Sequence, residues 1–469
     1  MSPDTMLQTS HSLRERLETA RRRAARLGTP VVVSLTQPLS EAPVMTAVFA
    51  AGTATSRRVC WSQPSRGLWV VGAGEAATLQ GSGIERFESV KASHRQLMSS
   101  AIIDAPEEFG TGPVFFGGFS FDTEAQKSAE WDGLGEGRFV LPRLVFAQTP
   151  AGGWLTTNAV VDGNADVASL EREAMEELAQ CQETRGTQPL GGERAHIWTD
   201  PDLKPKWGNA VRQVLQMIDE RRLEKVVLAR RLRLRADAPF FPPDILGRLN
   251  ASNPECLVFA FGVRQLCFLG ATPEILVRLK QGQVSSTCLA GSSPRGKNAA
   301  EDGRLGEQLL GSGKEQQEHA LVVKAVREGL EGLCSGLQWN QTPTLAKLRN
   351  VQHMSTSFSG RADRDRHVLD FVERLHPTPA VGGAPRETAM KAIREVEGMD
   401  RGWYAAPVGW IDRHGDGEFG VAIRSALVKG DRATLYAGAG IVAGSDTEQE
   451  FEETELKFGA LRSALVGNS

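Results

Sequence analysis

The chain has 469 residues, and its 54 basic and 57 acidic side chains leave a formal charge of −3. This near-balance argues against a nucleic-acid-binding protein, which usually carries a basic excess, and a hydrophobic content of 41% argues against a disordered acidic chain. No apolar run of about 18 residues is present, and residues 1–28 have an amphipathic pattern without an apolar core. We therefore expect a cytoplasmic globular protein with no membrane span and no secretory signal.

The first part of the chain predicts a mixed α/β region. Amphipathic helices are expected near Leu13–Leu27 and over residues 165–181. Apolar segments bounded by turn residues indicate strands at 29–35, 45–51, 112–122 and 139–148. Residues 183–196 are rich in Gly, Pro and charge without periodicity, which is typical of a linker. We accordingly divide the chain into an N-terminal region, 1–198, and a second region, 199–469.

The second region again combines helices and strands. Helical patterns cover residues 206–223, 304–333 and 446–465, and strands are expected at 225–236 and repeatedly within 256–279. Asp446 is a plausible N-cap for the last helix. Residues 376–444 are rich in glycine, which suggests close approach of the backbone to a ligand or to other backbone. The six cysteines lack CxxC spacing, so we expect reduced thiols and no structural zinc.

Two helices each carry a pair of glutamates three residues apart. At roughly 100° per residue, Glu315 and Glu318 lie about 60° apart on one helix face, beside its apolar arc. Glu450 and Glu453 repeat this spacing on the last helix, together with Lys457. Any single pair of this kind is more commonly a pair of surface glutamates exposed to solvent. Two pairs on amphipathic boundaries favour a shared site, and glutamate oxygens suit Mg²⁺.

Many motifs occur in one order from Trp207 to about Leu465: KVVLAR, GATPE, LAGSSPRG, KEQQEH, HMSTSFSG, HPTPAVGG, RGWYAAPVGW, VAIRSAL, YAGAGIVAGSD and EFEETELK. In these motifs the chain resembles the chorismate-utilising enzymes, the family that contains isochorismate, salicylate, anthranilate and aminodeoxychorismate synthases. The N-terminal FFGGFSFD and FVLP are similar to the menaquinone-type isochorismate synthases. The resemblance implies an α/β (α+β) sandwich of β-sheets packed face to face with outer helices, into which the N-terminal region is built. The linker at 183–196 would then be a surface loop.

The resemblance also implies a magnesium site. Glu318 and Glu453 match the family's direct Mg²⁺ ligands, and Glu315 and Glu450 match an outer pair that holds metal-bound waters. The metal would bridge the protein to a carboxylate of chorismate. Lys457 matches a basic residue beside that carboxylate.

Further motif positions match contacts to the substrate. Tyr404 and Arg424 match residues that hold the pyruvyl carboxylate, and arginine offers a planar two-pronged donor for it. Thr378 and Gly440 match polar and backbone contacts, and His353 matches a histidine that lines the ring site. Each of these side chains also has an ordinary structural explanation: Arg424 could form an ion pair, Tyr404 could be a half-buried aromatic residue, and His353 could be a histidine of the core.

Two positions indicate which nucleophile attacks C2 of chorismate. Lys225 matches the general base of water-using members, where anthranilate synthases carry Gln. Ala290 stands where aminodeoxychorismate synthases place a nucleophilic lysine, so direct water attack is favoured. Glu274 matches the general acid for the departing C4 hydroxyl, and its pKa should be raised because it must be protonated to donate. Ser292 replaces the frequent Thr of the motif and retains its hydroxyl.

The resemblance therefore implies an Mg²⁺-dependent isochorismate synthase, an isomerase that serves menaquinone or siderophore synthesis. A salicylate synthase, which also eliminates pyruvate, is the nearest alternative, and a non-catalytic chorismate-binding protein is the alternative of another class. We expect the small molecule chorismate as partner, and no nucleic acid, membrane or glutaminase subunit. A monomer or weak homodimer is expected.

Overall fold

The computed structural model describes residues 3–51, 57–183, 195–198 and 203–466. Within these ranges the helices are α1 (Pro3–Leu27), α2 (Met45–Ala51), α3 (Arg86–Met98), α4 (Val167–Glu183), α5 (Leu203–Asp219), α6 (Pro242–Ser252), α7 (Ala299–Gly311), α8 (Gly313–Glu331), α9 (Val368–Leu375), α10 (Arg386–Val396) and α11 (Thr447–Val466). None of the described helices is long and apolar enough to cross a membrane.

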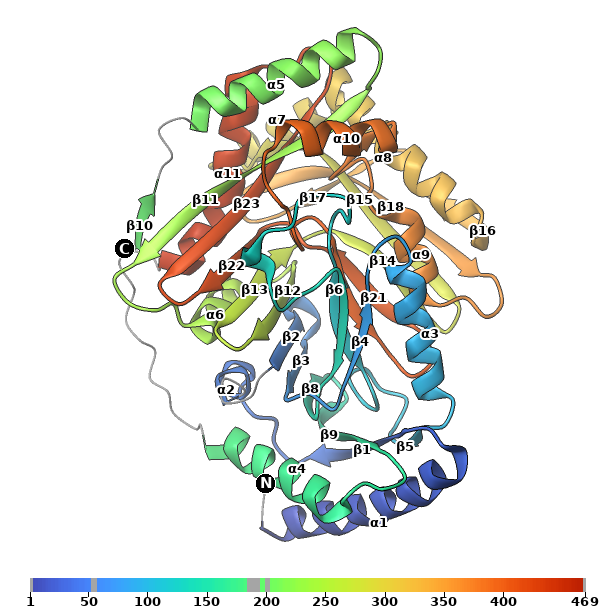
Figure 1. Cartoon of the computed structure of the whole chain (residues 1–469). Helices are drawn as coiled ribbons and strands as arrows, with labels where there is room; N and C mark the ends of the chain where they lie inside the picture. Colours follow the sequence, from blue (N-terminus) through green and yellow to red (C-terminus); the bar gives the residue numbers. More distant parts are fainter. Residues whose placement is uncertain (1–2, 52–56, 184–194, 199–202, 467–469) are drawn as a thin grey trace.

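Two large sheets form the centre of the molecule (Figure 1). The first has the order β10 (Ala195–Trp198), β11 (Lys225–Ala236), β23 (Arg432–Ile441), β22 (Ser425–Lys429), β13 (Leu266–Thr272), β12 (Leu257–Val263), β2 (Arg57–Gln63), β3 (Leu68–Ala73), β8 (Leu144–Thr149), β9 (Gly152–Val161), β1 (Val31–Leu39) and β5 (Ile102–Asp104), with β19 (Gly383–Ala384) also paired to β11. The second has the order β16 (Cys334–Trp339), β18 (Val351–Ala362), β15 (Gln283–Pro294), β14 (Ile275–Lys280), β21 (Gly417–Val421), β20 (Pro407–Ile411), β6 (Phe115–Phe119), β7 (Gly137–Leu141) and β4 (Ala77–Gly81), with β17 (Thr344–Lys347) paired to β18. Strands from both halves of the sequence therefore lie in both sheets.

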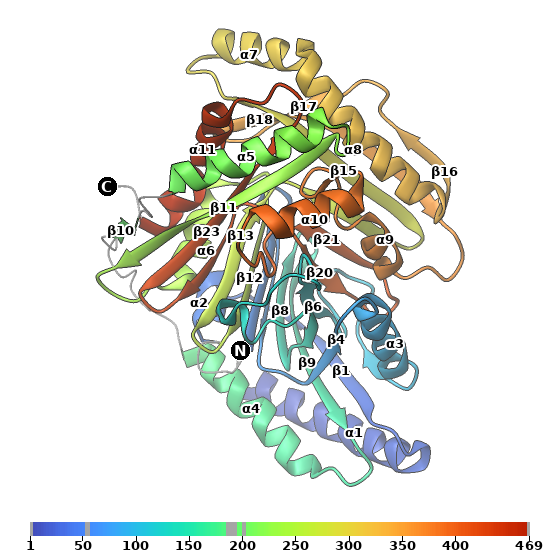
Figure 2. The same cartoon turned by 45° about the horizontal axis from the view of Figure 1, so that its top comes forward.

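The alternation of side chains along the strands explains the layers. In β12, Phe259 and Phe261 enter the core shared with the second sheet, whereas Val258 and Ala260 enter a second core. Helices α2, α6 and α11 cover this outer face of the first sheet, and α3, α8 and α9 pack on the second sheet (Figures 1 and 2). The predicted α/β sandwich of face-to-face sheets with outer helices is thus confirmed.

Some predicted elements are wrong. Residues 45–51, predicted as a strand, form helix α2, because Met45, Val48 and Phe49 have helical spacing and bury one stripe against the first sheet. The helical stretch 304–333 is divided into α7 and α8, where Ser312 caps the second helix. The predicted linker at 183–196 falls mostly outside the described residues, but Ala195–Trp198 forms strand β10 against β11.

The thiol prediction is confirmed: Cys60, Cys181, Cys256, Cys267, Cys288 and Cys334 are all free, and all but Cys181 are buried.

Candidate active site

A small cavity of about 90 Å³ lies where the two sheets meet helices α8 and α11. Most of the predicted site residues line it: Glu274, Ala290, Ser292, Glu315, Glu318, His353, Arg424, Gly440, Glu450, Glu453 and Lys457. Sequence reasoning missed Lys314, Gly438 and Ala380, which also line it. Residues separated by more than 180 positions are thereby brought to one place.

Helix α8 carries the first glutamate pair. The Ser312 side chain accepts a hydrogen bond from the Glu315 backbone N–H, so the helix begins immediately before the pair. Glu315 Oε2 accepts a hydrogen bond from the Ser292 backbone N–H at 3.2 Å. Burial, and then the neighbouring Glu318 carboxylate, raise the pKa of Glu315 to about 6. Glu315 is thus a buried hydrogen-bond acceptor that lies beside a second carboxylate, Glu318.

Helix α11 supplies the second pair. Asp446 caps this helix as predicted, because its Oδ1 accepts from the backbone N–H groups of Glu448 and Gln449 at 3.1 and 3.0 Å. Glu450 Oε1 lies 3.1 Å from the Lys314 Nζ of helix α8, so this ion pair joins the two helices. Burial, and then Glu453, raise the pKa of Glu450.

Lys457 partners the other carboxylate of α11. Its Nζ lies 2.6 Å from Glu453 Oε1 and donates to the Gly438 carbonyl at 2.8 Å. Burial alone would raise the pKa of Glu453, but the Lys457 ammonium outweighs burial and the pKa is lowered. Among the described residues, no group of three acidic, His or Cys side chains is arranged to hold a metal ion, and Lys314 and Lys457 each pair with a carboxylate of α11.

Lys225 begins strand β11 and is fully buried behind the cavity wall. Its Nζ lies 2.8 Å from Glu318 Oε1. Gly440, on the paired strand β23, leaves room for this contact. A Cβ at Gly440 would lie 2.7 Å from Glu318 Oε1 and 3.1 Å from Lys225 Cε, so a larger residue there would displace the Glu318 carboxylate and the Lys225 side chain.

A β-bulge orients Ser292 and His353. The register between β15 and β18 shifts after Ala290, where Gly291 has a φ of +76°. His353 Nδ1 lies 3.0 Å from Ser292 Oγ and 3.2 Å from the Gly291 carbonyl, and a carbonyl only accepts, so the proton is assigned to Nδ1. Burial, and then Arg424, lower the pKa of His353 to about 3. The neutral ring leaves Nε2 as a buried acceptor that has no partner in the described structure.

Glu274 and Arg424 lie at the turns between the sheets. Burial raises the pKa of Glu274 to about 8, although Lys225, Arg424 and Lys457 act in the opposite direction, and the predicted rise is confirmed in sign. Arg424 has a φ of +52°, a conformation that non-glycine residues adopt mainly where the surroundings hold them in it. Its guanidinium makes no hydrogen bond or ion pair with the described residues and lines the cavity.

Tyr404 and Thr378 do not line the cavity directly. The Tyr404 hydroxyl lies behind Gly438, 3.3 Å from where a Cβ of that glycine would be. Burial raises the pKa of Tyr404 to about 12, so the phenol remains a donor. Thr378 Oγ1 is buried and has no partner among the described residues, while Ala380, two residues on, reaches the cavity wall.

The chain is similar to known proteins in sequence and in fold. Residues 16–466 match the model of a family described as chorismate binding enzyme. The chain belongs to this family. It is 38% identical over 426 residues to the isochorismate synthase MenF of Bacillus subtilis, which covers 89% of this chain and 90% of that protein. It is 33% identical over 461 residues to the salicylate biosynthesis isochorismate synthase of Pseudomonas aeruginosa, with coverage of 98% and 95%.

Solved structures agree with this membership. MenF, the menaquinone-specific isochorismate synthase from Escherichia coli, is 26% identical, covers 96% of this chain and 100% of its own, and has a TM-score of 0.75. Anthranilate synthase component I from Streptococcus pneumoniae, at 21% identity and a TM-score of 0.65, shows the fold alone.

Proposed function

We propose that the protein is an isochorismate synthase, an isomerase that interconverts chorismate and isochorismate. The observation that carries the proposal is that buried Glu274 lines a carboxylate-rich cavity and buried Lys225 contacts Glu318 in its wall, in a chain similar to isochorismate synthases over most of its length. Ala290 in the cavity wall leaves no lysine there to act as nucleophile, which supports attack by water.

The acid and the base have separate roles. Lys225, in its neutral amine form, takes a proton from the water whose oxygen bonds to C2 of the ring, and the ring double bond shifts as the C4–oxygen bond breaks. Glu274, whose pKa of about 8 keeps it protonated near neutrality, gives its proton to the departing C4 hydroxyl, which leaves as water. Reversal exchanges the two roles. One water enters and one leaves, so substrate and product are isomers.

The carboxylates of the cavity fit a hard cation. Four glutamates on α8 and α11 are balanced by three lysines and Arg424, so the wall has no surplus positive charge for a dianionic substrate. Burial, and then a neighbouring carboxylate, raise the pKa values of Glu315 and Glu450, and a bound cation would offset both effects. We propose Glu318 and Glu453 as direct Mg²⁺ ligands, with Glu315 and Glu450 around them. When bound, Mg²⁺ supplies the positive charge that a substrate carboxylate needs beside these groups.

The remaining groups bind and orient the substrate. Arg424 provides an unpaired guanidinium for the pyruvyl carboxylate, with the Tyr404 hydroxyl behind Gly438. His353 Nε2 offers an acceptor for a ring hydroxyl. Gly440 admits the substrate close to the backbone of β23, and the Thr378 carbonyl accepts from the backbone N–H groups of Val381 and Gly382 and so holds the turn that carries Ala380.

The experiment that tests the proposal is a product assay. Purified protein is incubated with chorismate and Mg²⁺, with and without chelator, and the products are resolved by chromatography. Isochorismate alone supports the proposal, salicylate with pyruvate supports a salicylate synthase, and no turnover leaves a non-catalytic binding protein. Menaquinone synthesis and siderophore synthesis both start from isochorismate, and the similar isochorismate synthases are consistent with either role.

A further inference from the structure

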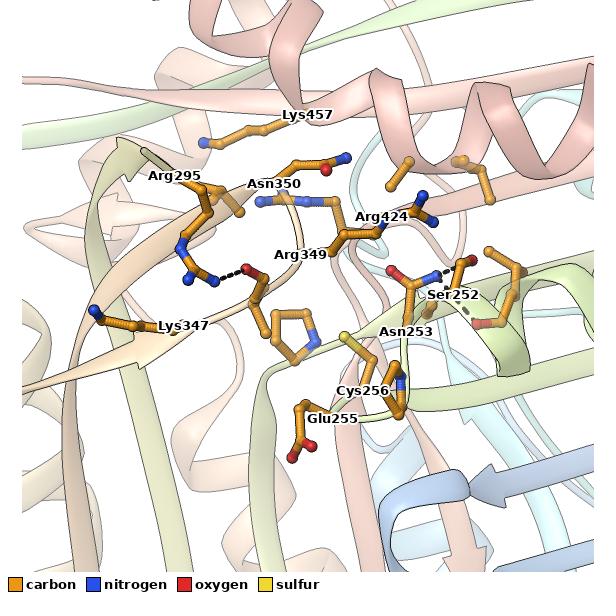
Figure 3. Close-up of a pocket in the computed structure, with 18 of the residues that line it drawn as sticks. Ser252, Asn253, Glu255, Cys256, Arg295, Lys347, Arg349, Asn350, Arg424 and Lys457 are labelled. Atoms are coloured by element: carbon orange, nitrogen blue, oxygen red, sulfur yellow. Dashed lines mark hydrogen bonds between the residues drawn. The ribbon is translucent and has the colours of Figure 1, made fainter. Parts of the chain in front are cut away.

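A second, larger pocket of about 330 Å³ shares a wall with the inner cavity. Pro273, Arg424 and Lys457 line both spaces, so the two meet at these residues. The end of helix α6, helix α11 and the turn between β17 and β18 enclose this outer pocket (Figure 3). The inner cavity holds the proposed chemistry, and the outer pocket lies next to it.

The charged residues of the outer pocket are mainly cations. Arg295, Lys347 and Arg349 join Arg424 and Lys457 in its lining, against the single carboxylate of Glu255 (Figure 3). Between the charges lie apolar side chains that include Leu348, Leu456 and Leu461. A pocket with an apolar wall and several cations suits a ligand with a hydrocarbon ring and more than one carboxylate.

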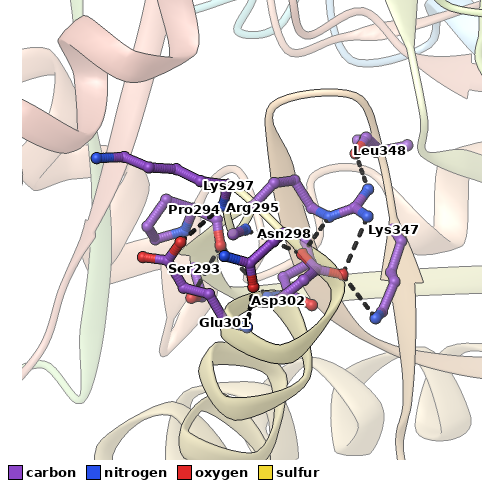
Figure 4. Close-up of polar contacts among 11 residues, drawn as sticks. Ser293, Pro294, Arg295, Lys297, Asn298, Glu301, Asp302, Lys347 and Leu348 are labelled. Carbon is purple, nitrogen blue, oxygen red and sulfur yellow. Dashed lines mark hydrogen bonds and ion pairs between the residues drawn. The ribbon is translucent and has the colours of Figure 1, made fainter.

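Asp302 fixes two of these cations. Its carboxylate pairs with Arg295 Nε at 2.6 Å and with Lys347 Nζ at 2.8 Å, and it accepts from the Gly296 backbone N–H at 3.0 Å (Figure 4). The segment after β15 is thereby tied to the end of β17. These contacts hold the rim of the outer pocket in place.

Arg349 differs from its neighbours at the rim. It is exposed, and the described part of the structure records no hydrogen bond or ion pair for its side chain. An exposed guanidinium without a carboxylate partner is not neutralised within the protein, so its field extends into solvent over a distance set by the salt concentration. A charge so placed attracts an anion to the pocket without contributing to the inner cavity's chemistry.

We propose that the outer pocket receives the dianionic cyclic substrate before it reaches the inner cavity, and that Arg349 attracts it there. The proposal rests on the proposed function for the identity of the dianion. Arg349 acts on the capture of substrate from solution and does not contact the reacting atoms. Its charge should therefore change kcat/KM in a salt-dependent way and leave the turnover of bound substrate, kcat, unaffected.

The test compares charge variants of the whole enzyme in the steady-state conversion of chorismate with Mg²⁺. Arg349→Glu is expected to lower kcat/KM about fivefold at an ionic strength of about 20 mM and to leave kcat within about twofold. At about 0.5 M salt, where the Debye length is roughly 4 Å, the difference should fall below about twofold. Arg349→Lys should behave like the parent protein, and Arg349→Gln should fall between the two.

The matched control is Arg26→Glu, which makes the same change of charge at the exposed end of α1, at the opposite end of the molecule from α7 and α11 (Figures 1 and 2). Equal kcat/KM for Arg349→Glu and Arg26→Glu at low salt would overturn the inference. A loss that does not change with salt, or that Arg349→Lys shares, would also overturn it. Failure of the parent protein to convert chorismate would instead refute the proposed function, so the two failures are distinguishable.

Discussion

Replacing Glu274 with Gln should make the protein more stable at neutral pH and inactive. Glu274 is 3% exposed, and burial raises its pKa to about 8. In the unfolded chain a glutamate titrates near its usual value of about 4.3. Between these two values the folded protein keeps the proton that the unfolded chain has lost, so stability falls as the pH rises through this window. Gln carries no charge and removes this loss.

The size of the effect follows from the two pKa values. Each pH unit in the window is worth about 1.4 kcal/mol, so Glu274→Gln should add about 1 kcal/mol at pH 5 and about 4 kcal/mol at pH 7. For a chain of 469 residues, about 4 kcal/mol corresponds to a Tm rise of about 4 °C. Turnover of chorismate should be abolished at every pH, because the amide cannot donate the proton.

Thermal unfolding measured from pH 5 to pH 8, alongside the product assay, checks both parts. Glu452→Gln, at an exposed position of α11, is the neutral control and should leave Tm unchanged. Asp302→Asn should act in the opposite direction, because the Arg295 guanidinium lowers the pKa of Asp302 and the charged form stabilises the fold. A Glu274→Gln variant that is no more stable than the parent at pH 7, or a difference that does not grow with pH, would refute the reasoning.

Three further predictions concern the inner cavity. Lys225→Ala should lower kcat at least about a hundredfold in the product assay while chorismate binding, measured by calorimetry, persists, and a fully active variant would exclude Lys225 as the base. Gly440→Ala should nearly abolish activity, because its Cβ would lie 2.7 Å from Glu318 Oε1, and its retained Tm would show that the loss is local. Glu453→Gln should weaken Mg²⁺ binding at least tenfold by titration calorimetry, and chelator should stop turnover of the parent protein until Mg²⁺ is restored; unchanged Mg²⁺ affinity would argue against a metal site on α11.

The sequence alone carried the information that depends on local spacing and on collinear motifs. It predicted the family, the α/β sandwich and the direction of the Glu274 pKa shift, all of which the structure and the comparisons confirm. It also predicted that Glu315 and Glu318 share a helix face, because the helical repeat determines the angle between residues three apart. Helical spacing requires only the residues of one segment, and motif matching requires only the order of the motifs along the chain.

Only the tertiary structure decided which groups meet across the chain. Residues 45–51 are apolar and short enough for either a strand or a helix, and packing against the first sheet decides for the helix. Lys314 pairs with Glu450, and the neutral His353 meets Ser292 across a β-bulge, through contacts between segments that no local pattern relates. The outer pocket likewise exists because α6, α11 and the β17–β18 turn converge. Burial, ion pairing and cavity shape depend on long-range packing, and local periodicity cannot supply them.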